Sequence, residues 1–441
     1  FIISWISWIA FIVIAPIEVQ AVIQYSSSYF PTLVNQINHV QHLTTQGFVV
    51  AFLLLLFLTI TNSISVKFMS HTNFILTLWK LSIPVLVIVF FLSGKFELHN
   101  LTQYGGFAPQ GAHGVFASLA IGGIILAFNG FQPGVALAGE TKNPQKNIPI
   151  AIIGSLVICT AIYCLLQFSF LMAIPSQLLK NGWSNLSFAQ EAGPLAGLLA
   201  ILGVFWFIKF LYLDSLVSPM GTAMVFFAAA ARSSFSMSKN LFLPKFFQKT
   251  TKKGIPVWGV VFNFFISCLI FLTFSGWQEM AAFYAAAICL CNSFIPLVLI
   301  TLRKHQGANY LQHTFKIPCY KIFSFIAFYI SNLMLYWCGW DMIFRLDAII
   351  IIGLILVSLD SFLSQRVLFP DLKSSFSFFF LIISMSIASK LSNYGNGIGL
   401  IDTRSEFVVV FVLSTVIFST SNLFCFSNQE TSFKIREYRN L

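Results

Sequence analysis

The chain has 441 residues, 57% hydrophobic and 9% charged, with a formal net charge of +11 and a mean hydropathy of +0.84. Soluble domains carry roughly a quarter charged residues, so this composition excludes a water-soluble fold. Most of the chain is instead expected in a lipid bilayer, as helices that satisfy their own backbone hydrogen bonds.

Apolar segments separated by polar, Pro- or Gly-containing breaks predict twelve membrane-spanning helices. Their predicted ranges are 1–25, 47–66, 74–93, 115–139, 149–174, 195–231, 256–275, 280–301, 321–340, 347–364, 375–391 and 406–426. The first residue is Phe1, inside an apolar run with no polar flank. We therefore expect an N-terminal segment to be missing.

The basic residues orient these helices, because cytoplasmic loops of membrane proteins carry an excess of Lys and Arg. If the first span is entered from the cytoplasm, most of the 25 Lys and Arg residues fall in cytoplasmic connections. The net positive charge then faces anionic lipid headgroups. A multi-pass protein of the cell membrane is predicted, with lipids as partners and no nucleic-acid partner.

Cysteine and histidine do not form the spacings of a metal or redox site. The eight Cys residues lie in or beside apolar runs without a CxxC pair, and the seven His residues are expected in the polar connections. No metal, disulfide framework or cofactor is therefore predicted, and enzymatic chemistry based on buried His is not expected.

The fourth predicted span combines helix-breaking residues with polar residues near its middle. Pro133 removes a backbone donor, Gly130 lowers the cost of unwinding, and Asn129 and Gln132 are polar. Open backbone at this depth is tolerated where it is buried in protein or lines a cavity, as in the substrate sites of secondary transporters. A Pro-kinked, Gly-packed helix is the alternative.

Charged residues within predicted spans are costly in lipid and usually functional. Lys80 is either a cation fixed within the protein or a side chain that extends to the membrane surface. Glu18 lies past the middle of the first span, where it either lines a transport path or hydrogen-bonds a neighbour. Asp214, Ser218 and Thr222 recur every four residues and form one polar stripe. The stripe suits a proton or cation path, or hydrogen bonding between helices.

Two sequence motifs resemble loops of the amino acid-polyamine-organocation (APC) permeases. The segment GFQPGVALAGETKNPQKNIPIAI, residues 130–152, is similar to the broken sixth helix and following loop of that family. The segment ARSSFSMSKNLFLPKFFQKTTKKGIPVWG, residues 231–259, is similar to its loop after the eighth helix. The chain thus resembles the third to fourteenth helices of a permease.

The resemblance implies an all-α, leucine-transporter-like bundle of inverted repeats, with an incomplete first repeat and about twelve transmembrane helices. It divides the chain into a transporter core, residues 1–364, and two additional C-terminal helices with a short cytoplasmic tail, residues 365–441. Because half of the family's substrate site comes from its first helix, we expect these 441 residues alone not to transport.

The resemblance also assigns roles to individual residues. The backbone from Phe128 through Asn129, Gly130 and Phe131 to Gln132 is expected to meet the amino and carboxylate groups of the substrate. Phe128 or Phe131 is expected to gate the site, since the Trp of some relatives aligns with Leu126.

The coupling residues are implied in the same way. Lys80 matches a lysine that replaces a sodium ion in sodium-independent or proton-coupled members, and the stripe of Asp214, Ser218 and Thr222 faces it. Many members have Glu where Gln132 stands, so proton transfer here would use Lys80, Glu18 or Asp214.

The function implied is a secondary active transporter of amino acids or related amines, working by alternating access and either proton-coupled or sodium-independent. An amino acid/polyamine antiporter and a non-transporting fragment or receptor-like relative are the alternatives. A channel is disfavoured, because the sequence shows no filter-like loop or ring of repeated polar residues.

Overall fold

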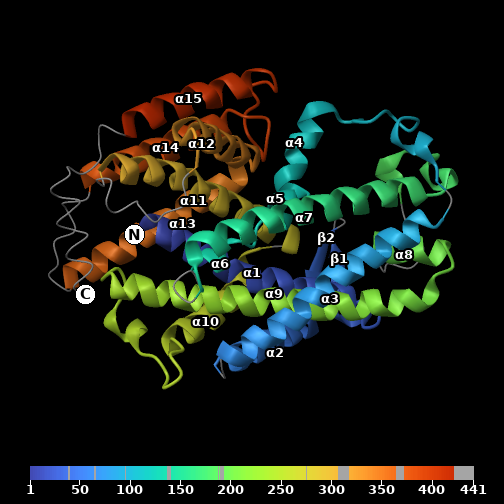
Figure 1. The fold of residues 1–441 in the computed structure, drawn as a ribbon, viewed down its shortest axis with the longest axis horizontal. Helices are drawn as coiled ribbons and strands as arrows, with labels where there is room; N and C mark the ends of the chain where they lie inside the picture. Colours follow the sequence, from blue (N-terminus) through green and yellow to red (C-terminus); the bar gives the residue numbers. More distant parts are fainter. Residues whose placement is uncertain are drawn as a thin grey trace.

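The computed structural model describes the chain except residues 38–39, 64–65, 95, 137–140, 187, 189–192, 275, 306–316, 364–371 and 422–441. The described part is a bundle of helices with one small β-hairpin (Figure 1). The helices are α1 (Ile2–Ser26), α2 (Thr45–Asn62), α3 (Val66–Leu92), α4 (Gly111–Ile121), α5 (Ile124–Ala127), α6 (Gln132–Ala136), α7 (Pro144–Ala173), α8 (Pro194–Ile201), α9 (Phe205–Lys239), α10 (Val257–Thr273), α11 (Trp277–His305), α12 (Tyr320–Trp337), α13 (Trp340–Leu363), α14 (Leu372–Lys390) and α15 (Ser405–Ser421). The strands β1 (Val34–Ile37) and β2 (Val40–Leu43) pair antiparallel, and 3-10 turns occupy Pro31–Leu33, Leu98–Leu101, Ser176–Leu179, Trp183–Asn185 and Lys245–Gln248.

Every predicted span coincides with a helix or a series of helices in the described residues. Seven of these helices are long and apolar enough to cross a membrane, and the bent pair 111–120 and 124–135 makes an eighth. Helices α10 and α15, and residues 375–390 of α14, are apolar but shorter. The chain is therefore a polytopic helical membrane protein, as the composition predicts.

Three local predictions were wrong. The sixth span is divided at Gly203, whose φ of +78° ends α8 before α9 begins. The connection after α1 contains the unpredicted hairpin of β1 and β2. His71, His113 and His305 lie within α3, α4 and α11 and not in polar connections, so the polar sequence around these residues did not reveal that they belong to helices.

Helix α1 lies at the centre of the bundle. It is apolar on all sides, and a helix of this kind is stable only in a protein interior or a membrane. It packs against α2, α9, α10, α11 and α13, and Figure 1 shows it behind α9. The long apolar helix thus forms the axis around which the others assemble.

Buried amides join the central helices. The Asn263 side chain of α10 accepts a hydrogen bond from Trp8 Nε1 of α1 at 3.2 Å and donates one to the Phe227 carbonyl of α9 at 3.1 Å. Further out, Asn332 of α12 accepts a hydrogen bond from Ser293 of α11 at 2.9 Å and donates one to Ser414 of α15 at 3.0 Å. Each amide fixes three helices relative to one another.

A second apolar core lies at the other end of α9. Side chains of α3, α7, α8 and the start of α9 form it, among them Phe91, Ile174, Leu198 and Phe207. This core holds the second half of α3 beside the first half of α9, next to Lys80 and Asp214.

We expect Asn263→Leu to destabilise the protein, because it leaves the Trp8 N–H without its acceptor and removes the bond from α10 to the Phe227 carbonyl of α9. Interhelical hydrogen bonds in membranes contribute about 1–2 kcal/mol each. The thermal unfolding midpoint of the detergent-solubilised variant should fall by several degrees. The control Phe265→Leu changes a side chain that is 60% exposed, on the same helix, and should leave the midpoint unchanged. Equal midpoints for the two variants would contradict this role.

Candidate substrate and coupling site

The fourth predicted span is interrupted at two glycines. Gly123, with φ of +74°, separates α4 from α5, and Gly130, with φ of +140°, lies in the four-residue gap before α6. Residues with a Cβ rarely adopt these values. The two parts of the span are bent by 50°. The structure thus has a broken helix where the sequence left a kinked helix as the alternative.

Side chains of the break satisfy part of its own backbone. Gln132 Oε1 accepts a hydrogen bond from the Gly130 N–H at 3.1 Å, and Gln132 Nε2 donates to Asn129 Oδ1 at 2.7 Å. Asn129 Nδ2 in turn donates to the Ile125 carbonyl at 2.6 Å. Gln132 therefore holds the shape of the break, a role that its amide performs without titrating.

Helix α7 supports the break from one side. The Phe128 ring meets the Tyr163 ring edge to face, with centroids 5.4 Å apart, and the Tyr163 hydroxyl donates to the Ala127 carbonyl at 3.2 Å. Phe128 is therefore held against α7 in this conformation. Phe131 is half-buried at the other end of the gap.

Lys80 reaches across from α3 to α9. Its Nζ donates a hydrogen bond to Thr222 Oγ1 at 2.6 Å. Gly221 lies beside it, and a Cβ at that position would come within 3.6 Å of Lys80 Cε and Nζ and within 2.8 Å of Leu76. The small residue gives α3 and the Lys80 side chain room against α9. The Lys80 ammonium is thus bonded to α9 within the protein. A lysine side chain that extended to the membrane surface would not need this partner.

The other residues of the polar stripe on α9 form hydrogen bonds with α3 or within α9. Trp79 Nε1 donates to Asp214 Oδ1 at 2.8 Å, and Thr222 Oγ1 donates to the Ser218 carbonyl at 3.4 Å. Neighbouring residues of α3 therefore contact two separate turns of α9. Asp214 and Thr222 thus face α3, and Ser218 joins them through its backbone carbonyl.

Glu18 brings the central helix into this cluster. It interacts electrostatically with Lys80, and the Tyr25 side chain of α1 interacts with both Glu18 and Asp214. The three charged residues are half-buried, so water and salt screen their charges only weakly. The structure thus brings Glu18, Lys80, Asp214 and Thr222 together across α1, α3 and α9, and Ser218 takes part through its carbonyl.

Some members of the site were not predicted from the sequence. Trp79, Tyr25 and Tyr163 contact the predicted residues, but aromatic residues are common in this chain, with 51 Phe, 12 Tyr and 9 Trp. The adjacency of Trp79 to Lys80 was the one usable signal. Helix α9 also packs against α6, so it contacts both the coupling cluster and the broken span.

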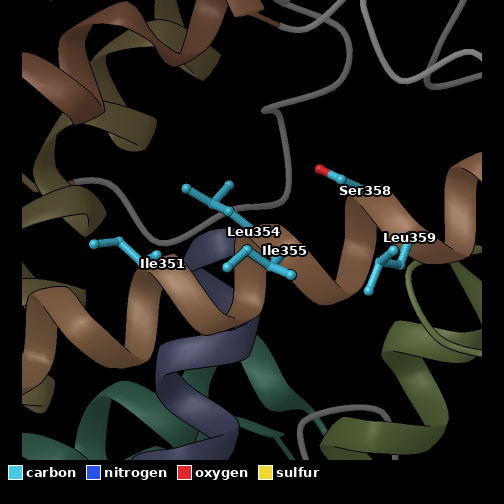
Figure 2. Close-up of a pocket in the computed structure, with 5 residues that line it drawn as sticks. All are labelled: Ile351, Leu354, Ile355, Ser358 and Leu359. Carbon is cyan, nitrogen blue, oxygen red and sulfur yellow. The ribbon is translucent and has the colours of Figure 1, made fainter.

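A surface cavity of about 370 Å³ lies elsewhere, on α13 (Figure 2). Its lining is Ile351, Leu354, Ile355, Ser358 and Leu359. Ile351 and Ile355 are more than half exposed. An apolar groove on the outside of a membrane protein meets lipid chains, and it offers no charged group to an amino acid.

The sequence is similar to those of known amino acid permeases and transporters. The family model described as amino acid permease matches residues 1–355. The chain belongs to the amino acid permease family. It is 31% identical over 424 residues to the glutamate/serine transporter AimA of Bacillus subtilis strain 168, covering 95% of this chain and 78% of that protein. It is 29% identical over 422 residues to the aspartate-proton symporter of the same strain, covering 95% and 80%.

A more distant relative is also named as an amino acid permease. The branched-chain amino acid permease BcaP of Bacillus subtilis is 25% identical over 314 residues, covering 70% of this chain and 63% of that protein. This permease is therefore a multi-pass protein of the cell membrane and a transporter of amino acids, as the motifs predicted.

We expect Gln132→Ala to weaken substrate binding, because the Gly130 N–H and the Asn129 amide lose their partner. A hydrogen bond contributes about 0.5–1.5 kcal/mol, so loss of the two bonds should raise KM roughly tenfold. Gln132→Glu keeps an acceptor for Gly130 and should have a smaller effect. The control Gln103→Ala changes an exposed side chain between α3 and α4. Uptake by the unchanged chain is measured first, since its absence would bear out the expectation that these 441 residues alone do not transport. Saturation of labelled amino acid uptake then gives KM, and an unchanged value for Gln132→Ala would refute the role of this cap.

Proposed function

We propose that this permease takes up an acidic or small polar amino acid together with a proton, by alternating access at the broken span, with Lys80 as the fixed cation of the coupling site. The observation that supports the proposal most is the hydrogen bond of 2.6 Å between Lys80 Nζ on α3 and Thr222 Oγ1 on α9. This bond holds the Lys80 ammonium between α3 and α9, and the family resemblance implies either a sodium ion or a lysine at this position.

Three ionisable groups meet at this point. Glu18 and Asp214 both interact electrostatically with Lys80. In a membrane interior a change in the charge of one group alters the free energy of the other two strongly, because water does not screen them. Loading or release of one proton in this cluster therefore changes how strongly α1, α3 and α9 attract one another. That change supplies a link between protonation and helix position.

The substrate segment is proposed to be the backbone from Phe128 to Gln132. Open backbone presents N–H and carbonyl groups of fixed direction to an amino acid's carboxylate and amino group. Because α6 packs on α9 and the coupling cluster includes α9, movement of that helix reaches both parts of the site. The reaction moves the substrate and leaves it chemically unchanged.

The substrate class follows from the relatives. AimA is named for glutamate and serine, and the second relative for aspartate and protons. We propose the same substrate range here, and test it by competition with unlabelled glutamate, aspartate, serine and leucine. Export of a polyamine driven by uptake would identify an antiporter, and binding without flux would identify a receptor-like protein.

We expect Lys80→Ala to reduce the stimulation of glutamate or serine uptake by an inward proton gradient roughly tenfold or more. An ionisable group inside the membrane is usually functional, so its removal should remove the coupling. The matched control is Lys209→Ala, because Lys209 lies on α9 only a few residues after its start at Phe205 and outside the Lys80 contacts. Uptake is measured at fixed internal pH while the external pH is varied. Gradient-driven uptake that survives Lys80→Ala would overturn the proposed coupling role.

A further inference from the structure

Two aromatic side chains of α4 stack on residues from other parts of the chain. The His113 ring lies on the Tyr394 ring, with centroids 4.6 Å apart and planes 13° from parallel. The Phe116 ring lies on the Trp337 ring at 4.3 Å and 5°, and meets the Phe407 ring edge to face at 5.4 Å. The first part of the broken span is therefore held by the end of α12 and by the region where α15 begins.

A buried carboxylate fixes those partners to one another. Glu406 is 1% exposed, and its Oε1 accepts a hydrogen bond from Trp337 Nε1 at 3.1 Å. Burying a carboxylate is costly without such a partner. The bond ties α15 to α12 beside the Phe116 ring, and it sets the surface on which that ring stacks.

The connection between α14 and α15 is anchored to α13. The Tyr394 and Gly395 carbonyls accept hydrogen bonds from the Trp340 and Asp341 N–H groups at 3.2 and 3.1 Å. Asn396 Nδ2 also donates to Asp341 Oδ2 at 2.7 Å. Tyr394 is thus held by the scaffold independently of its stacking on His113.

The start of α15 is fixed as well. The Glu406 N–H donates to the Asp402 carbonyl at 3.1 Å. The Ser405 hydroxyl and N–H both hydrogen-bond the Asp402 carboxylate and hold the pKa of this exposed group below its ordinary value. Asp402 therefore stays ionised at neutral pH, as suits a carboxylate at a helix N-terminus.

Helix α4 has the opposite character. It is joined to the substrate segment through Gly122 and Gly123, and a Cβ at Gly123 would meet no atom within 4 Å. Its described residues are mostly exposed or half-buried. Figure 1 shows α4 beside the end of the bundle where α14 and α15 are joined, and α4 also packs against α11 and α12. A short helix on a glycine hinge is thus held by these two helices and by the aromatic stacks at its far end.

We propose that Tyr394, Glu406, Phe407 and Trp337 form an outer latch that holds α4 closed over the substrate segment, and that the latch must release before substrate enters from the external side. The external side is the one opposite the Lys-rich connection between α9 and α10. Three of the four latch residues follow residue 355, where the match to the family model ends. The proposal rests on the proposed function, since it describes control of the same site.

The first experiment locks the latch. His113→Cys and Tyr394→Cys are combined with Asn129→Cys, and the first two thiols are joined with a short methanethiosulfonate cross-linker that dithiothreitol reverses. We expect cross-linking to slow labelling of the introduced thiol at position 129 by an impermeant maleimide roughly tenfold, as for a shift to a closed state. Labelling should recover on reduction. Amino acid uptake is measured before cross-linking, after cross-linking and after reduction, in the double variant that carries His113→Cys and Tyr394→Cys without Asn129→Cys.

The controls and outcomes separate the latch from transport itself. A cross-link between Phe325→Cys of α12 and Phe411→Cys of α15, whose rings are 5.6 Å apart, joins two scaffold helices and should change neither readout. Variants that carry only one of the two introduced cysteines are treated with the same reagent. They show how much of each effect comes from reaction at the native cysteines. Unchanged labelling at position 129 after cross-linking overturns the latch. Slowed labelling in a chain that shows no uptake supports the latch and counts against the proposed function.

The second experiment weakens the latch in the Asn129→Cys variant. Phe116→Leu removes the ring stacked on Trp337 while keeping an apolar side chain, and should speed external labelling at position 129 several-fold, because the closed state loses an aromatic contact. Phe265→Leu on the exposed face of α10 is the matched control. Surface biotinylation confirms equal amounts of each variant. Labelling that is no faster in Phe116→Leu than in the control contradicts the proposal.

Discussion

The absence of water from the membrane interior is the constraint on which this structure depends. Every N–H and carbonyl there needs a partner within the protein, and a continuous helix provides one at each residue. The chain departs from that rule at the break after α5, where Gln132 and Asn129 replace the helical bonds with their own amides. The break is therefore a maintained feature, supplied with side-chain donors and acceptors in the place where backbone is opened toward a substrate.

The same constraint accounts for the polar residues in the core. Asn263 and Asn332 each bridge neighbouring helices, so their amides are satisfied while they set helix positions. Lys80 and Asp214 follow this pattern between α3 and α9, but they carry charge. Amides can only hold helices together, whereas the charged groups also respond to the gain or loss of a proton. This difference separates the scaffold from the proposed coupling cluster.

Helix α9 and helix α4 have contrasting places in the proposed cycle. Helix α9 is long, central and shared, because it packs on α1, α3, α6 and α10. Helix α4 is short and hinged, and its stacking partners belong largely to residues after 355. Transport by alternating access needs one part that transmits a change and another that opens. We propose that the charged cluster acts on the first and the outer latch on the second.

The sequence alone predicted the class of fold, the approximate positions of the helices and the broken span. Hydrophobicity and helix-breaking residues are local properties, and in lipid they leave few alternatives to a helix. The motifs around residues 130–152 and 231–259 also indicated the family that the comparisons confirmed. The coupling role of the five predicted residues remains a proposal, although the structure brings Glu18, Lys80, Asp214 and Thr222 together.

The tertiary structure decided which side chains meet. Trp79 differs from the other tryptophans in sequence only by its place beside Lys80, and its role appears when α3 packs on α9 and its N–H reaches Asp214. Tyr163, His113 and Glu406 likewise acquire partners far away in the chain. Local hydrophobicity determines that a segment is a helix in the membrane, but contacts between helices depend on packing among residues hundreds of positions apart. For that reason the composition predicted a membrane protein, and only the folded chain showed how its few polar side chains are paired.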